Sequence, residues 1–292
     1  MQLIDIKNAI EQQISDDLNR CGLMFRLFGR VKTTRSLAHK MEWKGDSYRS
    51  GEKKIQDVIG LRIVLYFPDD VELLGFFFSC KNLVDASVDT PGVDTFRPQR
   101  LNLVKPIPQD LVEAFHSALP AEYAPYIDST YEVQIRTIFS EGWHEVEHDL
   151  RYKCKEDWVG YDTHSRALNG ISATLETAEW TMSSLFRDLA RLNLERNELQ
   201  AMMRNKMLIR LADNNFSAPV LDFLQANPDV VQQLFHADRM VFLITLLSHR
   251  GNIPLTYDNI LFLINRFDLM NEALQQLEPP STSAVINAFL QS

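Results

Sequence analysis

The stretch YEVQIRT at residues 131–137 decides the fold that we expect for this chain. Its apolar Tyr, Val and Ile residues alternate with polar Glu, Gln and Arg residues. Successive side chains of a β-strand point to opposite faces of a sheet, so this alternation predicts a half-buried strand with one polar face. A second run, GLRIVLY at residues 60–66, is apolar and β-branched and predicts a buried strand.

Helices are expected on either side of these two strands. Amphipathic spacing predicts them at residues 1–28, 33–44, 141–153 and 163–211, followed by short helices to the end of the chain. In the third of these, Trp143, Val146 and Leu150 would share one apolar face. The intervening segment 79–130 is punctuated by prolines, which predicts loops and edge strands there.

Composition places the chain in the ordinary globular class. It has 292 residues, of which 45% are hydrophobic and 24% are charged, enough for one large or two modest domains. Its N-terminus lacks the pattern of a secretory signal, and its longest apolar stretches are far shorter than the roughly 20 residues of a membrane span. The three cysteines are unclustered, which argues against a disulfide framework. We therefore expect a cytoplasmic protein with no membrane segment.

The net charge of −9 is unevenly distributed. Residues 20–54 contain ten Lys and Arg residues and three acids. From residue 211 onward there are eight acids, three Arg and no Lys, a net charge of −5. The first segment would attract polyphosphate, and the second would repel it.

Basic residues with helical spacing lie near the start of the chain. Arg30, Lys32, Ser36 and Lys40 form the pattern R-x-K-x3-S-x3-K. The last three recur every four residues, so they would line one face of a helix. Such a face could hold a polyphosphate, although a solvated basic surface has the same spacing.

A second pattern, D-x-x-G-x-R, begins at Asp57 and ends at Arg62 on the predicted buried strand. Alone, this pattern is weak evidence, because Asp and Gly are common in the turn before a strand. Together with Glu132, however, Asp57 would supply two carboxylates near the basic helix. Such a pair suits a magnesium site for phosphoryl chemistry.

Four segments together resemble the synthetase domain of the RelA/SpoT family, and they occur in the family's order. They are FGRVKTTRSLAHK (28–40), DVIGLRIV (57–64), YEVQIRT (131–137) and WHEVEHDLRYK (143–153). The resemblance implies an α/β (α+β) fold, a nucleotidyltransferase-like mixed sheet flanked by helices, followed here by a C-terminal all-helical module. It also implies transfer of the β,γ-diphosphate of ATP to the 3′-hydroxyl of a guanine nucleotide, which gives (p)ppGpp and AMP.

The resemblance further implies how the donor nucleotide would bind. Arg30 and Arg62 would sandwich the adenine. Lys32, Ser36 and Lys40 would hold the ATP phosphates.

The resemblance also implies the catalytic groups. Asp57 and Glu132 would bind Mg²⁺, with Glu132 close to the attacking hydroxyl. Gln134, Arg136 and His148 would support the acceptor and the developing charge.

The segment that usually reads guanine in this family departs from its pattern here. The family carries a G-Y-x-S-x-H-like stretch whose Tyr stacks on guanine, whereas this chain has TFRPQRLNLV at residues 95–104. Phe96, Arg97 and Arg100 could replace that platform, because an aromatic ring or a guanidinium plane can stack on a base. Two alternatives therefore stay open: a toxin-like pyrophosphokinase acting on an adenine nucleotide or a tRNA 3′ end, and a catalytically silent sensing module.

Residues 144–148 spell H-E-x-x-H, the signature of a zinc protease. That site needs a third ligand, and the residue twenty positions past His148 is Leu168. Since the family resemblance already accounts for Glu147 and His148, we prefer it to zinc hydrolysis.

We expect two domains, a synthetase domain at residues 1–205 and a helical regulatory or interaction module at 206–292. The expected small-molecule partners are ATP and a guanine nucleotide. A homo-oligomer, a protein partner of the helical module and tRNA stay open as further partners.

Overall fold

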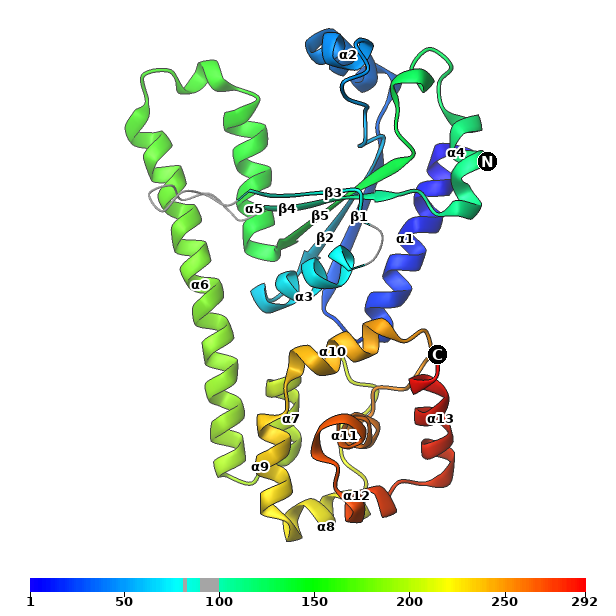
Figure 1. The fold of residues 1–292 in the computed structure, drawn as a ribbon. Coiled ribbons are helices and arrows are strands. Elements are labelled where there is room, and N and C mark those ends of the chain that lie inside the picture. The colour runs from blue at the N-terminus through cyan, green and yellow to red at the C-terminus, as the bar shows by residue number, and fades with distance from the viewer. Residues whose placement is uncertain (81–82, 90–99) are drawn as a thin grey trace. The chain divides into compact units, whose positions relative to one another are not determined.

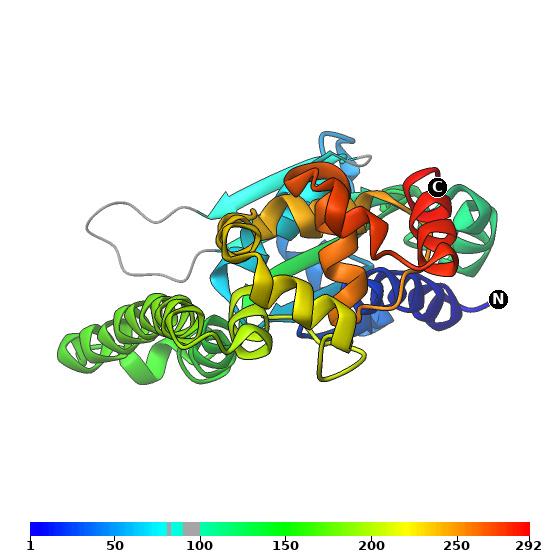
Figure 2. The ribbon, with the colours of Figure 1, turned by 90° about the horizontal axis from the view of Figure 1, so that it is seen from below.

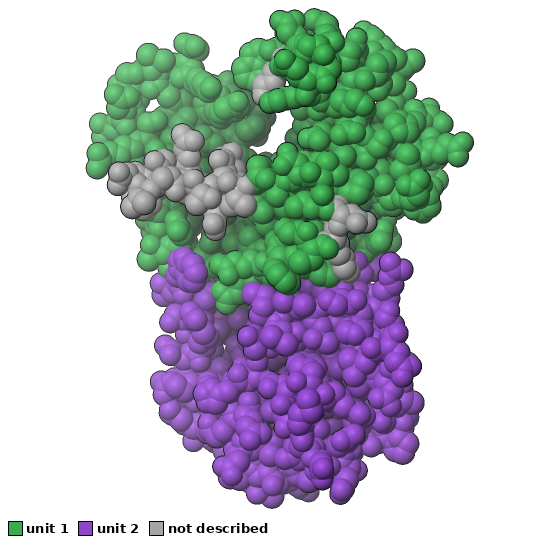
Figure 3. Space-filling view, viewed as in Figure 1, with its two compact units in different colours: residues 1–15, 25–179 green, residues 16–24, 180–292 purple. Residues whose placement is uncertain are grey.

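A five-stranded mixed sheet forms the centre of the N-terminal part of the chain (Figure 1). The computed structural model describes residues 1–80, 83–89 and 100–292. Contacts divide the chain into a sheet unit, residues 1–15 and 25–179, and a helical unit, residues 16–24 and 180–292 (Figure 3). The sequence placed the boundary near residue 205, whereas this division falls inside a continuous helix.

The elements of the sheet unit follow one another as helices and strands, with short 3₁₀ and π turns between some of them. They are α1 (Leu3–Arg20), β1 (Phe25–Val31), α2 (Thr34–Arg49), β2 (Ile59–Leu65), α3 (Pro68–Ser79), β3 (Asp85–Asp89), β4 (Arg100–Pro106), α4 (Val112–Ala118), β5 (Thr130–Thr137), α5 (Ile138–Glu147) and α6 (Asp162–Glu195). Both α1 and α6 extend into the helical unit.

The sheet has the strand order β1-β2-β5-β4-β3. Strands β2 and β5 run parallel at its centre, and the other neighbours are antiparallel. The mixed sheet flanked by helices that the sequence predicted is confirmed. The predicted strands at 60–66 and 131–137 are β2 and β5, and both are largely buried.

Strand β1 corrects the prediction of a helix over residues 1–28. Helix α1 ends at Arg20, and Gly22 takes a left-handed backbone with φ +68°. Such a glycine is a common helix terminator. The following residues alternate between half-buried and exposed, as an edge strand does.

Strand β4 corrects part of the expectation for residues 79–130. We expected loops and edge strands, but β4 lies between β5 and β3 inside the sheet. Its single proline, Pro106, is the last residue of the strand, so it interrupts little of the ladder.

Helices α1 and α3 cover the apolar face of the sheet. Leu61, Val133 and Leu103 lie side by side on that face and are at most 1% exposed. Gly29 on β1 lies against α1, because a Cβ there would meet the side chain of Glu11. The opposite face of the sheet carries polar side chains.

Helix α5 follows β5 directly. Thr137 begins it as the N-cap, accepting a hydrogen bond from the Ser140 amide at 3.1 Å. The predicted apolar face of this helix is wrong: Trp143 is 5% exposed, but Val146 is 48% and Leu150 63% exposed. The chain turns π-helical over His148–Tyr152, which moves later residues out of the phase of an α-helix.

In the described residues of the helical unit, every regular element is a helix (Figures 1 and 2). Beyond α6 these are α7 (Leu199–Met207), α8 (Ala218–Ala226), α9 (Pro228–His236), α10 (Arg239–Ser248), α11 (Tyr257–Ile264), α12 (Glu272–Gln276) and α13 (Pro280–Leu290). Helix α11 is almost wholly buried. Within the described chain no single helix has the length and apolar composition of a membrane span, although the bent pair α9 and α10 passes that test together.

Candidate functional site

Polar side chains predicted from separate motifs meet on one face of the sheet. In the register of β1, β2 and β5, Arg30 lies opposite Gly60, and Gly60 opposite Glu132. Two residues further along these strands, Arg62 lies opposite Gln134. Cross-strand partners project to the same face, so residues predicted to bind the donor and residues predicted to be catalytic share one surface.

A first pocket, here called the arginine pocket, opens on this face. It contains both predicted adenine-binding arginines and the predicted Glu132, Gln134 and His148. Its lining residues are Phe28, Gly29, Arg30, Gly60, Leu61, Arg62, Glu132, Gln134, Glu145, His148, Asp149 and Lys153.

A second pocket, here called the lysine pocket, lies beside the first. Its lining residues are Lys40, Ser47, Tyr48, Gly51, Glu52, Lys53, Lys54, Gln56, Asp57, Asp85, Val104, Asp128 and Glu132. Glu132 lines both pockets, so the two pockets adjoin at this residue.

Asp57 is held by two lysines. Lys32 donates to one carboxylate oxygen at 2.6 Å, and Lys40 donates to the other at 2.8 Å. Burial would raise the pKa of Asp57, but the hydrogen bonds from the two lysines outweigh it and leave the pKa lowered. Burial also lowers the pKa of Lys32, against the effect of Asp57. The predicted phosphate and metal residues therefore form one charged cluster.

Ser36 keeps its four-residue helical spacing to Lys40 on α2, but its spacing to Lys32 is not helical. It lies in the first turn of α2, where its hydroxyl is 2.9 Å from that of the N-cap Thr33. Lys32 precedes this helix, so the four-residue spacing does not describe a single helical face. The two lysines meet through Asp57 instead.

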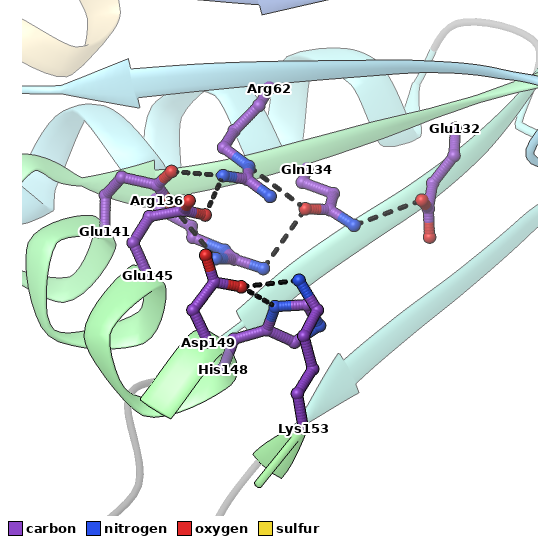
Figure 4. A network of polar contacts seen from close by, with 9 residues as sticks. All are labelled: Arg62, Glu132, Gln134, Arg136, Glu141, Glu145, His148, Asp149 and Lys153. Carbon is purple, nitrogen blue, oxygen red and sulfur yellow. Dashed lines mark hydrogen bonds and ion pairs between the residues drawn. The ribbon is translucent and has the colours of Figure 1, made fainter. Parts of the chain in front are cut away.

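A ring of hydrogen bonds joins three side chains of the polar face to one side chain of α5 (Figure 4). Its members are Arg62 on β2, Gln134 and Arg136 on β5, and Glu141 on α5. Arg62 donates to Glu141 and, through Nε, to Gln134 Oε1 at 3.3 Å. Arg136 closes the ring by donating to Glu141 Oε2 at 3.0 Å and to Gln134 Oε1 at 3.1 Å. The Gln134 amide nitrogen in turn donates to Glu132 Oε2 at 3.1 Å.

Acidic residues of α5 hold the Arg62 side chain. Glu145 pairs with it as well as Glu141. Burial would lower the pKa of Arg62, but the two carboxylates outweigh this and raise it. Arg62 is thus fixed in the wall of the pocket.

His148 lies at the rim of the arginine pocket with Asp149 and Lys153 (Figure 4). Its Nδ1 is 3.1 Å from Asp149 Oδ1, which also accepts a hydrogen bond from Lys153 at 2.6 Å. The ring stacks on Tyr152, with centroids 5.6 Å apart and planes 12° from parallel. His148 is therefore oriented by its neighbours along the helix.

The H-E-x-x-H histidines do not gather a third metal ligand in the described part of the chain. Their ring centroids are 5.7 Å apart, and His144 is only 7% exposed. A catalytic zinc site needs three protein ligands and an open position, so this arrangement gives no support to zinc hydrolysis.

The predicted acceptor residues Phe96 and Arg97 lie outside the described residues. Arg100 begins β4, where its backbone pairs with Asp89. Further along β4, Asn102 lies opposite Gln134. Asn102 therefore continues the row of polar residues formed by Arg62 and Gln134 onto a third strand.

The carboxylates Asp57 and Glu132 fit a magnesium ion by their chemistry. Both line the lysine pocket, and the lowered pKa keeps Asp57 ionised near neutral pH. Magnesium takes oxygen ligands and is usually held by one or two carboxylates together with phosphates and water.

Several residues in or beside the two pockets were missed from the sequence. Glu141 and Glu145 are one turn apart on α5, and that spacing directly after the YEVQIRT strand was the available signal. Phe28 is 53% exposed and faces Arg62 across the strand pair. The only sequence signal for Phe28 was its position as the first residue of the segment FGRVKTTRSLAHK.

Comparison with known proteins locates the similarity in the sheet unit. Residues 29–157 match the family model described as the region found in RelA/SpoT proteins. No match was found among curated proteins.

Solved structures with a similar chain trace share low sequence identity. A GTP pyrophosphokinase family protein from Streptococcus pneumoniae is 18% identical, with 62% of this chain and 88% of that chain covered and a TM-score of 0.46. The small alarmone synthetase 1 from Bacillus subtilis, in a structure bound to its product pppGpp, is 20% identical, with 63% and 93% covered and a TM-score of 0.45. The small alarmone synthetase 2 from Bacillus subtilis is 21% identical, with 62% and 91% covered and a TM-score of 0.44.

Proposed function

Because residues 29–157 carry the RelA/SpoT region, we propose that the sheet unit is a nucleotide pyrophosphokinase. It transfers the β,γ-diphosphate of ATP to the 3′-hydroxyl of a guanine nucleotide. The observation that carries this proposal is the Asp57 cluster, in which two lysines hold a charged carboxylate beside Glu132 and next to a pocket lined by two arginines.

The donor nucleotide occupies both pockets in this proposal. Its adenine lies between Arg30 and Arg62 in the arginine pocket. Its phosphates take Lys32 and Lys40 as partners, because phosphate oxygens are strong acceptors for charged donors. With the lysines on the phosphates, the Asp57 carboxylate would be available to hold Mg²⁺ together with Glu132.

Transfer requires an in-line attack at the β-phosphorus. The 3′-oxygen of the acceptor bonds to that phosphorus, the bond to the α,β-bridging oxygen breaks, and AMP leaves with the bridging oxygen. The hydroxyl proton passes to Glu132 Oε1, since Oε2 accepts from Gln134. Held by Asp57 and Glu132, Mg²⁺ would neutralise charge on the diphosphate.

Arg136 and His148 act on the charge that develops during transfer. Arg136 is 3% exposed and is fixed by Glu141 and Gln134. A preorganised cation in a dry wall stabilises a transition state more than a mobile surface charge does.

The acceptor is proposed as a guanine nucleotide, with an adenine nucleotide or a tRNA 3′ end as the alternatives. The alternatives are favoured by the departure of residues 95–104 from the guanine-reading pattern. Phe96, Arg97 and Arg100 are proposed to bind the acceptor base.

One assay tests the function and its acceptor. The protein is incubated with Mg²⁺, ATP labelled in the β-phosphate and, separately, GDP, GTP, ADP, ATP and deacylated tRNA. Label transfer with release of AMP supports the proposal, and Asp57→Asn or Glu132→Gln should abolish it in a folded protein. If no acceptor is labelled, the catalytically silent reading replaces it. If Phe96→Ala, Arg97→Ala and Arg100→Ala all leave acceptor choice and rate unchanged, residues 95–104 do not read the base.

A further inference from the structure

Glu141 is the member of the ring of hydrogen bonds to which no role has been assigned above. We propose that Glu141 is a positioning residue that fixes the Glu132 carboxylate through Arg136 and Gln134. This inference rests on the proposed function, in which Glu132 is the group that meets the acceptor hydroxyl.

The first step is the hold of Glu141 on Arg136. The Glu141 side chain is 14% exposed and that of Arg136 is 3% exposed. Their hydrogen bond measures 3.0 Å. A charge this deeply buried depends on a fixed partner, because an isolated ion is costly to remove from water. Glu141 therefore determines where the guanidinium of Arg136 lies.

The second step is the orientation of the Gln134 amide. Its oxygen accepts from two guanidinium groups, Arg62 Nε at 3.3 Å and Arg136 Nη2 at 3.1 Å. A guanidinium has donors and no acceptor, so both arginines select the oxygen of the amide and turn its nitrogen the other way. The amide nitrogen consequently points at Glu132.

The third step is the carboxylate itself. The Gln134 amide nitrogen donates to Glu132 Oε2 at 3.1 Å, and both residues lie on β5, two positions apart. One oxygen of Glu132 is thereby held by a neighbour on its own strand, which fixes the direction of the carboxylate at a residue that lines both pockets. Figure 4 shows the whole path from Glu141 to Glu132.

Glu145 provides a matched control one turn further along α5. Among the described residues its ion pair is with Arg62, and its side chain is 52% exposed. Removing its charge changes one contact of Arg62 and leaves the contacts from Glu141 through Arg136 and Gln134 to Glu132. Glu145→Gln should therefore raise the KM for ATP, and its kcat should fall less than that of Glu141→Gln.

The test is steady-state diphosphate transfer by wild type, Glu141→Gln, Glu145→Gln and Glu141→Asp. A misplacement of about 1 Å can cost about 100-fold in rate. Glu141→Gln should lower kcat by about tenfold to 100-fold, with a KM for the acceptor near that of wild type. Glu141→Asp keeps the charge that the fold needs and withdraws it by one methylene, so its kcat should also fall.

A double-mutant cycle separates positioning from a general structural effect. If Glu141 acts through Gln134, its substitution should cost little more in a Gln134→Leu background, because residues acting as a unit are not additive. Fully additive losses, or wild-type kcat in Glu141→Asp, would overturn the inference. Should Glu141→Gln fail to fold, Glu141→Asp decides alone. A wild type that transfers no diphosphate at all would instead overturn the proposed function, and this inference with it.

Discussion

Lys40 donates a 2.8 Å hydrogen bond to Asp57 in the lining of the lysine pocket, although the two residues are seventeen positions apart in the chain. Lys40 belongs to α2 and Asp57 precedes β2. Their contact joins two motifs that the sequence could only place in order. With Lys32, it neutralises the Asp57 carboxylate, and a bound polyphosphate would compete with Asp57 for the two lysines.

The pairing of Asp57 predicts a pH dependence of stability. Its folded pKa is lowered, so its contribution is present in full above the unfolded value of about 3.9 and is lost as the pH falls through the folded pKa. Asp57→Asn should therefore lower the melting temperature at pH 7, and the difference from wild type should shrink below about pH 4. The control is Asp46→Asn, whose carboxylate is fully exposed. A difference that persists unchanged to pH 2 would contradict the pairing.

Lys40 should bind the phosphates of ATP. Hydrogen bonds to charged groups are worth about 1.5–3 kcal/mol, so Lys40→Met should raise the Kd for ATP by about tenfold to 100-fold. Titration calorimetry with a non-hydrolysable ATP analogue measures this directly. Arg35→Met, an exposed residue of the same helix outside both pockets, is the control and should bind as wild type. Equal affinity of the Lys40 variant and wild type would remove Lys40 from the donor site.

Phe28 should contribute to binding of the donor base. Its ring is exposed in the arginine pocket beside two guanidinium groups, and stacking on an aromatic side chain is worth about 1–3 kcal/mol per base. Phe28→Ala should weaken ATP binding about fivefold to 100-fold, while Phe28→Trp should retain it. Competition by adenosine distinguishes base from phosphate contacts. If the alanine variant binds adenosine as well as wild type does, Phe28 carries no stacking role.

The ion pair of Arg266 and Glu278 should stabilise the helical unit. The Glu278 side chain is 1% exposed and lies 2.9 Å from Arg266. Removing one partner of a buried pair typically costs about 3–5 kcal/mol, whereas replacing both by apolar residues is often neutral. Arg266→Met should lower stability by that amount, and Arg266→Met combined with Glu278→Met should recover most of it. Urea unfolding followed by circular dichroism measures both, and a single variant as stable as wild type would show that the pair is not buried in solution.

The central strands and the motif residues could be predicted from the sequence because their patterns are local. YEVQIRT alternates over its seven residues, and its polar face is the face of the site. The edge strand β1 was missed because its start follows an amphipathic helix without a break in polarity, and only Gly22 marks the turn.

The contacts between motifs could not be predicted in the same way. That Lys32 and Lys40 converge on Asp57 depends on how α2 lies relative to the residues before β2, which the spacing alone does not give. The role of Glu141 depends on the direction of α5 after β5. Such relations follow from tertiary packing, which no local pattern encodes.

The most direct test of the central claim is transfer of labelled diphosphate from ATP to a guanine nucleotide by the purified protein, measured beside Asp57→Asn. The account predicts stoichiometric release of AMP and a product carrying two additional phosphates on its 3′ position, both absent in the variant. Transfer at the wild-type rate by a folded Asp57→Asn protein would contradict it.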